Sequence, residues 1–145
     1  MSECSQTFIW SGIEELGVID TRKSANISSL FYYAHLLKKI EKLILKEEPQ
    51  KIDNIFDGCG SLIDITIEGE FFYNLKLKDC KKLSYNSIIS VINALSQESS
   101  GTTISFSIVA INNAFETAVG AADGSTSEEW LTLANTKPNW TISLV

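Results

Sequence analysis

Apolar residues recur along this chain at one long-range offset. When residues 27–40 are laid over residues 52–65 at a constant offset of 25, six positions match in apolar or small character. The matched pairs are Ile27 with Ile52, Leu30 with Ile55, Phe31 with Phe56, Ala34 with Cys59, Leu37 with Leu62 and Ile40 with Ile65. Self-similarity at a fixed period is typical of repeat architectures, in which stacked units share one continuous core.

The spacing inside each unit predicts a short helix followed by a strand. The first four matched positions follow the i, i+3, i+4, i+7 pattern of one helix face, and the later ones approach an extended segment at residues 63–67. A competing pattern covers residues 30–47, where apolar residues and lysines also suit a single amphipathic helix. We favour the repeat, because six matches at one offset are harder to obtain by chance than one helical stripe.

The second half of the chain predicts further strands and helices. Ser84 is a suitable N-cap for a helix whose apolar face lies within residues 88–95, and residues 111–118 keep helical spacing. Residues 126–129 (Thr-Ser-Glu-Glu) fit a capping box for another helix. Four segments have strand character and are expected side by side in one sheet: 63–67, 74–77, 103–108 and 139–144.

Several of these segments resemble a known family. They are residues 20–23 (Asp-Thr-Arg-Lys), 27–31, 55–62 and 139–142 (Asn-Trp-Thr-Ile). They are similar to BspA-like leucine-rich repeats of bacterial surface proteins and to the closing strand of such proteins in gut bacteria and their phages. The resemblance extends over roughly residues 18–145. The family's Met-Phe pair is replaced by Leu-Phe and Ile-Phe, and Ala34 stands where a cysteine is usual. The resemblance implies a solenoid for adhesion or recognition and brings no catalytic residues.

The predicted fold class is α/β, as a leucine-rich-repeat-type solenoid with a short helix and a strand in each turn and one small sheet with helices on its other side. Residues 1–17 are expected to form an N-terminal strand or cap segment, and residues 18–145 the repeat domain with its C-terminal cap, within a single domain overall. Eight residues are expected to share one core: Phe31, Phe56, Leu62, Ile65, Leu77, Leu83, Ile92 and Phe106.

Charge narrows the classes of function. Twelve basic and eighteen acidic residues give a net charge of −6, which disfavours both a phosphate backbone and an anionic bilayer as partners. No apolar run approaches the roughly 18 residues of a membrane span, and the N-terminus lacks the basic start and apolar stretch of a signal peptide. We expect no nucleic acid and no membrane insertion. The resemblance implies the bacterial cell surface or a phage virion as the location.

Residue types that carry chemistry are few and scattered. Cys4, Cys59 and Cys80 are an odd number at wide spacing, and His35 is the single histidine, which argues against a disulfide scaffold and a structural zinc. Residues 53–64 place acids at some positions of a calcium loop, but the third position is apolar. We therefore expect no catalytic residues, no metal site and no cofactor, and the chain is predicted not to be an enzyme.

The candidate ligand-binding residues are exposed side chains on predicted strands. Thr66, Lys76 and Ser105 lie between inward positions, and Tyr73 ends a run of three aromatics that cannot all face one core. Residues 32–33 (Tyr-Tyr) likewise cannot both face the core, so at least one aromatic of each group is expected to face outward. The leading hypothesis is a non-catalytic recognition or adhesion module that binds protein or glycan on a cell surface. The alternative is a structural cap or assembly segment of a longer repeat protein, in contact with neighbouring chains of the same assembly.

Overall fold

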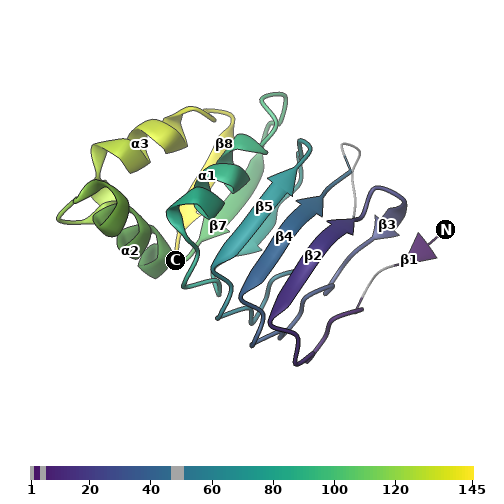
Figure 1. Ribbon diagram of the computed structural model, residues 1–145. Helices are drawn as coiled ribbons and strands as arrows, with labels where there is room; N and C mark the ends of the chain where they lie inside the picture. The colour runs from purple at the N-terminus through teal and green to yellow at the C-terminus, as the bar shows by residue number, and fades with distance from the viewer. Residues whose placement is uncertain (1, 4–5, 47–50) are drawn as a thin grey trace.

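Short parallel strands stack coil upon coil along most of the chain, and helices close the C-terminal end (Figure 1). The computed structural model describes residues 2–3, 6–46 and 51–145. The strands are β1 (Ser2–Glu3), β2 (Glu15–Asp20), β3 (Ser24–Asn26), β4 (Lys39–Ile44), β5 (Asp64–Glu68), β6 (Leu75–Leu77), β7 (Thr102–Phe106) and β8 (Trp140–Leu144). The helices are α1 (Tyr85–Asn93), α2 (Ile108–Val119), the 3-10 turn η1 (Gly124–Thr126) and α3 (Glu128–Asn135).

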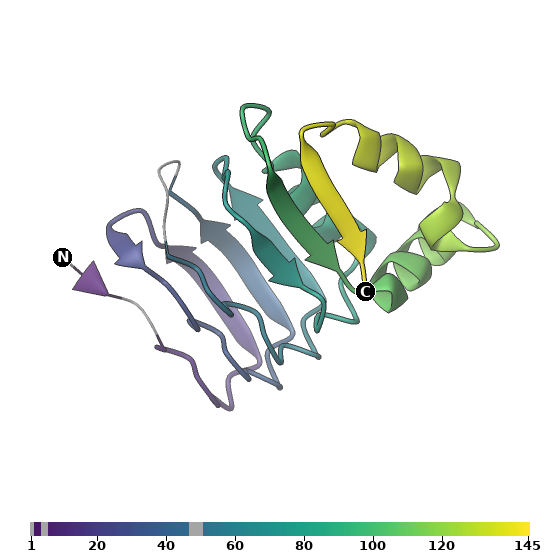
Figure 2. The ribbon, with the colours of Figure 1, turned by 180° about the vertical axis from the view of Figure 1, so that it is seen from behind.

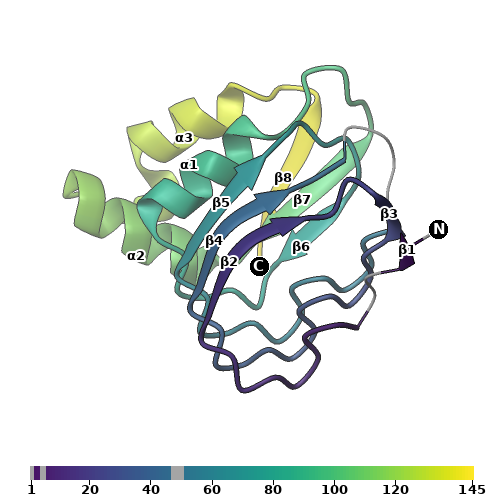
Figure 3. The ribbon, with the colours of Figure 1, turned by 45° about the vertical axis from the view of Figure 1, so that its right-hand side comes forward.

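The strands form three parallel sheets on two sides of one core. Their orders are β1-β3, β2-β4-β5 and β6-β7-β8. Figure 3 shows β2, β4 and β5 on one side and β6, β7 and β8 on the other, and Figure 2 shows β7 (green) beside β8 (yellow) from behind. The prediction of a single sheet was wrong, because β5 belongs to a different sheet from β6, β7 and β8. The chain crosses from one side of the core to the other between β5 and β6.

The repeat predicted from the sequence is confirmed by the strand register. Ile40 on β4 pairs with Ile65 on β5, which is the predicted offset of 25, while Leu16 on β2 pairs with Ile40 at an offset of 24. Residues 39–44 are therefore a strand, and the competing helix over residues 30–47 does not form. The first coil already includes β2, so the predicted boundary between residues 17 and 18 falls inside a strand.

The predicted short helices of the repeat are instead chains of tight turns. Over residues 27–34, alternate backbone N–H groups donate to the next coil, for example from Phe31 to the Ile55 carbonyl at 3.1 Å. Three of the four intervening groups donate three residues back, as from Leu30 to Ile27 at 3.2 Å, and the Ser28 N–H donates to the Asn26 side chain. A helix satisfies its N–H groups within itself. Here half of them bond between coils, so the expectation of helices in these units was wrong, although the same residues face inward.

Helix α1 covers the edge that β5 would otherwise expose. Helix α1 lies beside β5, where a further strand would lie (Figure 1). The Ser87 hydroxyl accepts from the Ile65 N–H at 2.9 Å, and the Ser90 hydroxyl accepts from the Ile67 N–H at 2.9 Å. Ser84 caps α1 as predicted. Uncovered edge strands invite pairing with other chains, and this helix protects one of them.

One buried cluster runs through all coils and confirms the predicted core. All eight residues expected there belong to it. Its centre contains a stack of phenylalanines from successive coils: Phe8 and Phe31 have ring centroids 5.7 Å apart, and Phe31 and Phe56 5.5 Å apart. Stacked units bury apolar sides that no single coil could cover alone.

Candidate functional site

The structure separates the predicted binding residues into two groups. Lys76 on β6 and Ser105 on β7 are direct partners in the strand register, and Ser143 on β8 continues the row. Thr66 is exposed on β5, in the other sheet. A single strand face containing Thr66, Lys76 and Ser105 therefore does not form, because β5 and β6 lie on opposite sides of the core.

A polar face covers the outside of the β6-β7-β8 sheet. Leu75, Leu77, Ile104 and Phe106 alternate inward, so the residues between them face outward. Besides the Lys76 row, this face carries Thr103 opposite Thr141. The Asn74 side-chain oxygen accepts from the Thr103 N–H at 2.8 Å and holds the start of the sheet. Short hydroxyl side chains and one lysine thus give this face hydrogen-bond donors and acceptors.

Tyr73 lies at the edge of the core rather than on this polar face. Its ring stacks on that of the fully buried Phe71, with centroids 5.4 Å apart. Burial raises the pKa of its phenol well above the usual value, so the group stays protonated. Tyr73 is half-buried, as is Phe72. The structure thus places Tyr73 mainly as a packing residue.

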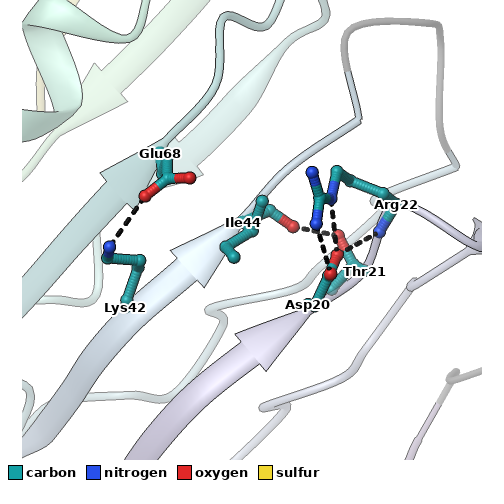
Figure 4. A network of polar contacts seen from close by, with 6 residues as sticks. All are labelled: Asp20, Thr21, Arg22, Lys42, Ile44 and Glu68. Atoms are coloured by element: carbon teal, nitrogen blue, oxygen red, sulfur yellow. Dashed lines mark hydrogen bonds and ion pairs between the residues drawn. The ribbon is translucent and has the colours of Figure 1, made fainter.

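The outer face of the β2-β4-β5 sheet carries paired charges (Figure 4). Arg22 donates to both carboxylate oxygens of Asp20, at 3.0 and 2.7 Å, and Lys42 binds Glu68 at 2.8 Å. The hydrogen bonds from Arg22 lower the pKa of Asp20 to about 2, and the contact with Glu68 raises the pKa of Lys42. The Lys42–Glu68 pair joins two neighbouring strands, and the Asp20–Arg22 pair is local to the end of β2. Charges paired in this way satisfy one another, so this face offers less to a ligand than the polar one.

Exposed aromatic rings line the edge of the solenoid formed by the turns between the two sides. Trp10 and Tyr33 stack with centroids 4.8 Å apart and planes inclined by 14°. Trp10 is 64% exposed and Tyr33 40%. Tyr32 contacts Tyr33 edge-on at 4.6 Å. We call Trp10, Tyr32 and Tyr33 the aromatic edge. The expectation that one aromatic of the Tyr-Tyr pair faces outward is met by Tyr33, whereas Trp10 was not singled out from the sequence.

Two residues of the aromatic edge, Trp10 and Tyr33, have a left-handed backbone, a conformation that large side chains rarely adopt. Trp10 has φ of 52° and Tyr33 φ of 53°, and the equivalent residue in the next coil is Gly58, with φ of 77°. A side chain at Gly58 would meet Tyr33 at 3.0 Å, so the Tyr33 ring occupies the space that the glycine leaves. Left-handed geometry costs a residue with a Cβ about 1–2 kcal/mol. Trp10 and Tyr33 both adopt this unfavourable conformation.

Side chains that could hold a metal ion are not clustered in the part of the chain that the structure describes. No group of three or more His, Cys, Asp or Glu side chains comes together there. Cys59 and Cys80 are buried free thiols, and burial raises the pKa of Cys59 to about 12 and that of Cys80 above its usual value. His35 is exposed, with its ring near the Tyr33 carbonyl. Cys4 lies outside the described residues.

Comparisons with protein-family models, with curated proteins and with solved structures gave no match. The class of the molecule therefore rests on its architecture, a mixed α/β solenoid of stacked parallel strands. None of the helices within the described ranges is long and apolar enough to cross a membrane.

Proposed function

We propose that this chain is a non-catalytic recognition module of the leucine-rich-repeat type, which serves adhesion in a bacterial surface protein or a phage structural protein. The observation that carries the proposal is the aromatic edge, where Trp10 and Tyr33 are stacked, exposed and held in left-handed backbone. The resemblance to BspA-like repeats supports the same class of function.

Stability alone favours other residues at these positions. Glycine and asparagine adopt left-handed backbone at least cost, and the chain uses them at Gly58 and Asn54. Trp10 gains little burial to offset its strain, because most of its surface remains exposed. Strained residues that persist at a surface point to a functional requirement. Tryptophan and tyrosine are also the side chains most enriched in binding hot spots.

The test is to remove the aromatic side chains while relieving the strain. Trp10→Gly and Tyr33→Gly should change the free energy of unfolding by no more than about 1 kcal/mol, because the lost stacking of about 0.5–1.5 kcal/mol is offset by relaxed backbone. Binding to whole bacterial cells should be lost. Ser29→Gly is the matched control, since Ser29 is also left-handed (φ 57°) but carries no aromatic ring. Unchanged binding by both aromatic variants would refute this role.

A second candidate function is assembly with a neighbouring solenoid. Among the described residues, no strand pairs with the outer edge of β2, and Phe8 ends the phenylalanine stack half-buried. The C-terminal end, by contrast, is covered by helices. A terminal coil with an open edge is suited to stack on another coil. Phe8→Glu should then abolish association with the neighbouring solenoid in sedimentation experiments, while cell binding by the isolated chain persists. Intact association in this variant would exclude the assembly role.

A further inference from the structure

A small pocket opens at the start of the β6-β7-β8 sheet, away from the aromatic edge. It has a volume of about 320 Å³ and lies between Phe72, which precedes β6, and the segment that leads into β7. The other lining residues are Glu98, Ser99, Ser100 and Thr102. Small-molecule sites occupy roughly 300–1,000 Å³, so this pocket suits a ligand of one ring rather than a chain.

Two hydroxyls at this pocket are buried without a partner. Ser99 is 5% exposed, and neither its Oγ nor the Oγ1 of Thr102 has a hydrogen-bond partner among the described residues. The neighbouring Ser96 is equally buried, but its Oγ accepts from the Glu98 N–H at 3.2 Å. A buried polar group without a partner costs about 1–3 kcal/mol. The unsatisfied atoms gather where the surface is hollowed, so a bound polar molecule is the natural partner for them.

We propose that this pocket binds one neutral sugar ring, either as a free saccharide or as the terminal unit of a glycan. Hydroxyls of the sugar both donate and accept, which matches Ser99 and Thr102. The half-buried Phe72 ring offers an apolar surface for the C–H face of the sugar. The exposed Glu98 carboxylate accepts from sugar hydroxyls and repels acidic sugars. The pocket is independent of Trp10 and Tyr33, and it therefore goes beyond the recognition role proposed for them.

The polar face beside the pocket extends the same chemistry. Asn74 and Thr103 are hydrogen-bonded to each other at the start of β6 and β7, two residues after Phe72 and one residue after Thr102. Further hydroxyls follow along the strands, so additional sugar units linked to the first have donors and acceptors to meet. This makes the terminal unit of a neutral glycan the expected natural form of the ligand.

Saturation-transfer NMR with the full chain tests the proposal. The probes are the methyl glycosides of glucose, galactose, mannose and N-acetylglucosamine, with methyl glucuronide as the acidic comparison. At least one neutral glycoside should receive saturation from the protein, and the glucuronide should receive less. In Ser99→Ala the affinity should fall roughly two- to tenfold, the value of one hydrogen bond, while stability stays equal or rises because an unsatisfied hydroxyl is removed. In Phe72→Ala the affinity should fall as well.

Ser28→Ala is the matched control, because the Ser28 hydroxyl is likewise buried without a partner but lies in a different coil. It should leave the affinity for the neutral glycosides unchanged. The proposal would be overturned if no neutral glycoside received saturation, or if Ser99→Ala and Phe72→Ala bound the sugar as tightly as the unaltered protein. It would also be overturned if Ser28→Ala lost as much affinity as Ser99→Ala. Failure of cell binding through the aromatic edge would leave these measurements unaffected, so the two proposals fail separately.

Discussion

The hydroxyl of Ser87 on α1 accepts a hydrogen bond from the backbone N–H of Ile65 on β5 at 2.9 Å, and it donates to the Ile63 carbonyl at 3.0 Å. One serine side chain therefore performs, for the last strand of its sheet, the pairing that a further strand would provide. Because Ser87 is buried, water does not replace these bonds when they are lost.

Ser87→Ala should lower the free energy of unfolding by about 1–3 kcal/mol, because the Ile63 carbonyl and the Ile65 N–H lose their side-chain partner within a packed interface. Urea denaturation measures the change. Ser100→Ala is the control, since Ser100 is exposed and its removal should stay within about 0.5 kcal/mol. Equal effects of the two substitutions would mean that α1 does not depend on Ser87 to cover β5.

Phe56→Ala should lower the free energy of unfolding by about 3–5 kcal/mol, the usual range for a buried phenylalanine. Phe56 is 1% exposed and ends the stack that begins with Phe8. Phe8→Ala should cost less, because Phe8 is half-buried at the outer end of that stack. Denaturant titrations of both variants give the comparison. A loss under about 1 kcal/mol for Phe56→Ala would place this ring outside the core.

Lys137→Met should destabilise the protein by about 1.5–3 kcal/mol, the range for hydrogen bonds that involve a charged group. The buried Lys137 ammonium donates to the Leu95 carbonyl at 2.5 Å and lies 3.4 Å from the Asn93 carbonyl, so it satisfies the C-terminal end of α1. Lys76→Met removes the same charge from an exposed position and should change the melting temperature little. A similar melting temperature for both variants would contradict the structural role of Lys137.

The Asp20 carboxyl should titrate with a pKa of about 2 instead of its ordinary 3.8, because Arg22 donates to it. A folded-state pKa below the unfolded value means that Asp20 stabilises the protein above about pH 4. This contribution is lost as the pH falls from about 4 to 2. Carbon-13 NMR of the carboxyl group measures the midpoint, and Arg22→Gln should return it toward 3.8. A midpoint near 3.8 in the unaltered protein would show that the ion pair does not persist in solution.

The sequence determined which residues are buried and which coils are equivalent. The offset of 25 that pairs Ile40 with Ile65 in the alignment of the chain on itself is the register of β4 and β5. This was predictable because every coil needs apolar residues at the same places to share one core. The polar face was predictable only in part: Lys76 and Ser105 were chosen for their outward positions, but their direct pairing required the arrangement of β6 beside β7.

Only the tertiary structure decided how the backbone between those residues runs and which surfaces result. The i, i+3, i+4, i+7 spacing of residues 27–34 is compatible with a helix and with successive turns, and the choice depends on carbonyls one coil away, such as that of Ile55 for the Phe31 N–H. Local patterns contain no information on such distant partners. For the same reason the sequence could not separate Thr66 from Lys76 or bring Trp10 onto Tyr33, because these relations arise from the stacking of coils rather than from neighbours along the chain.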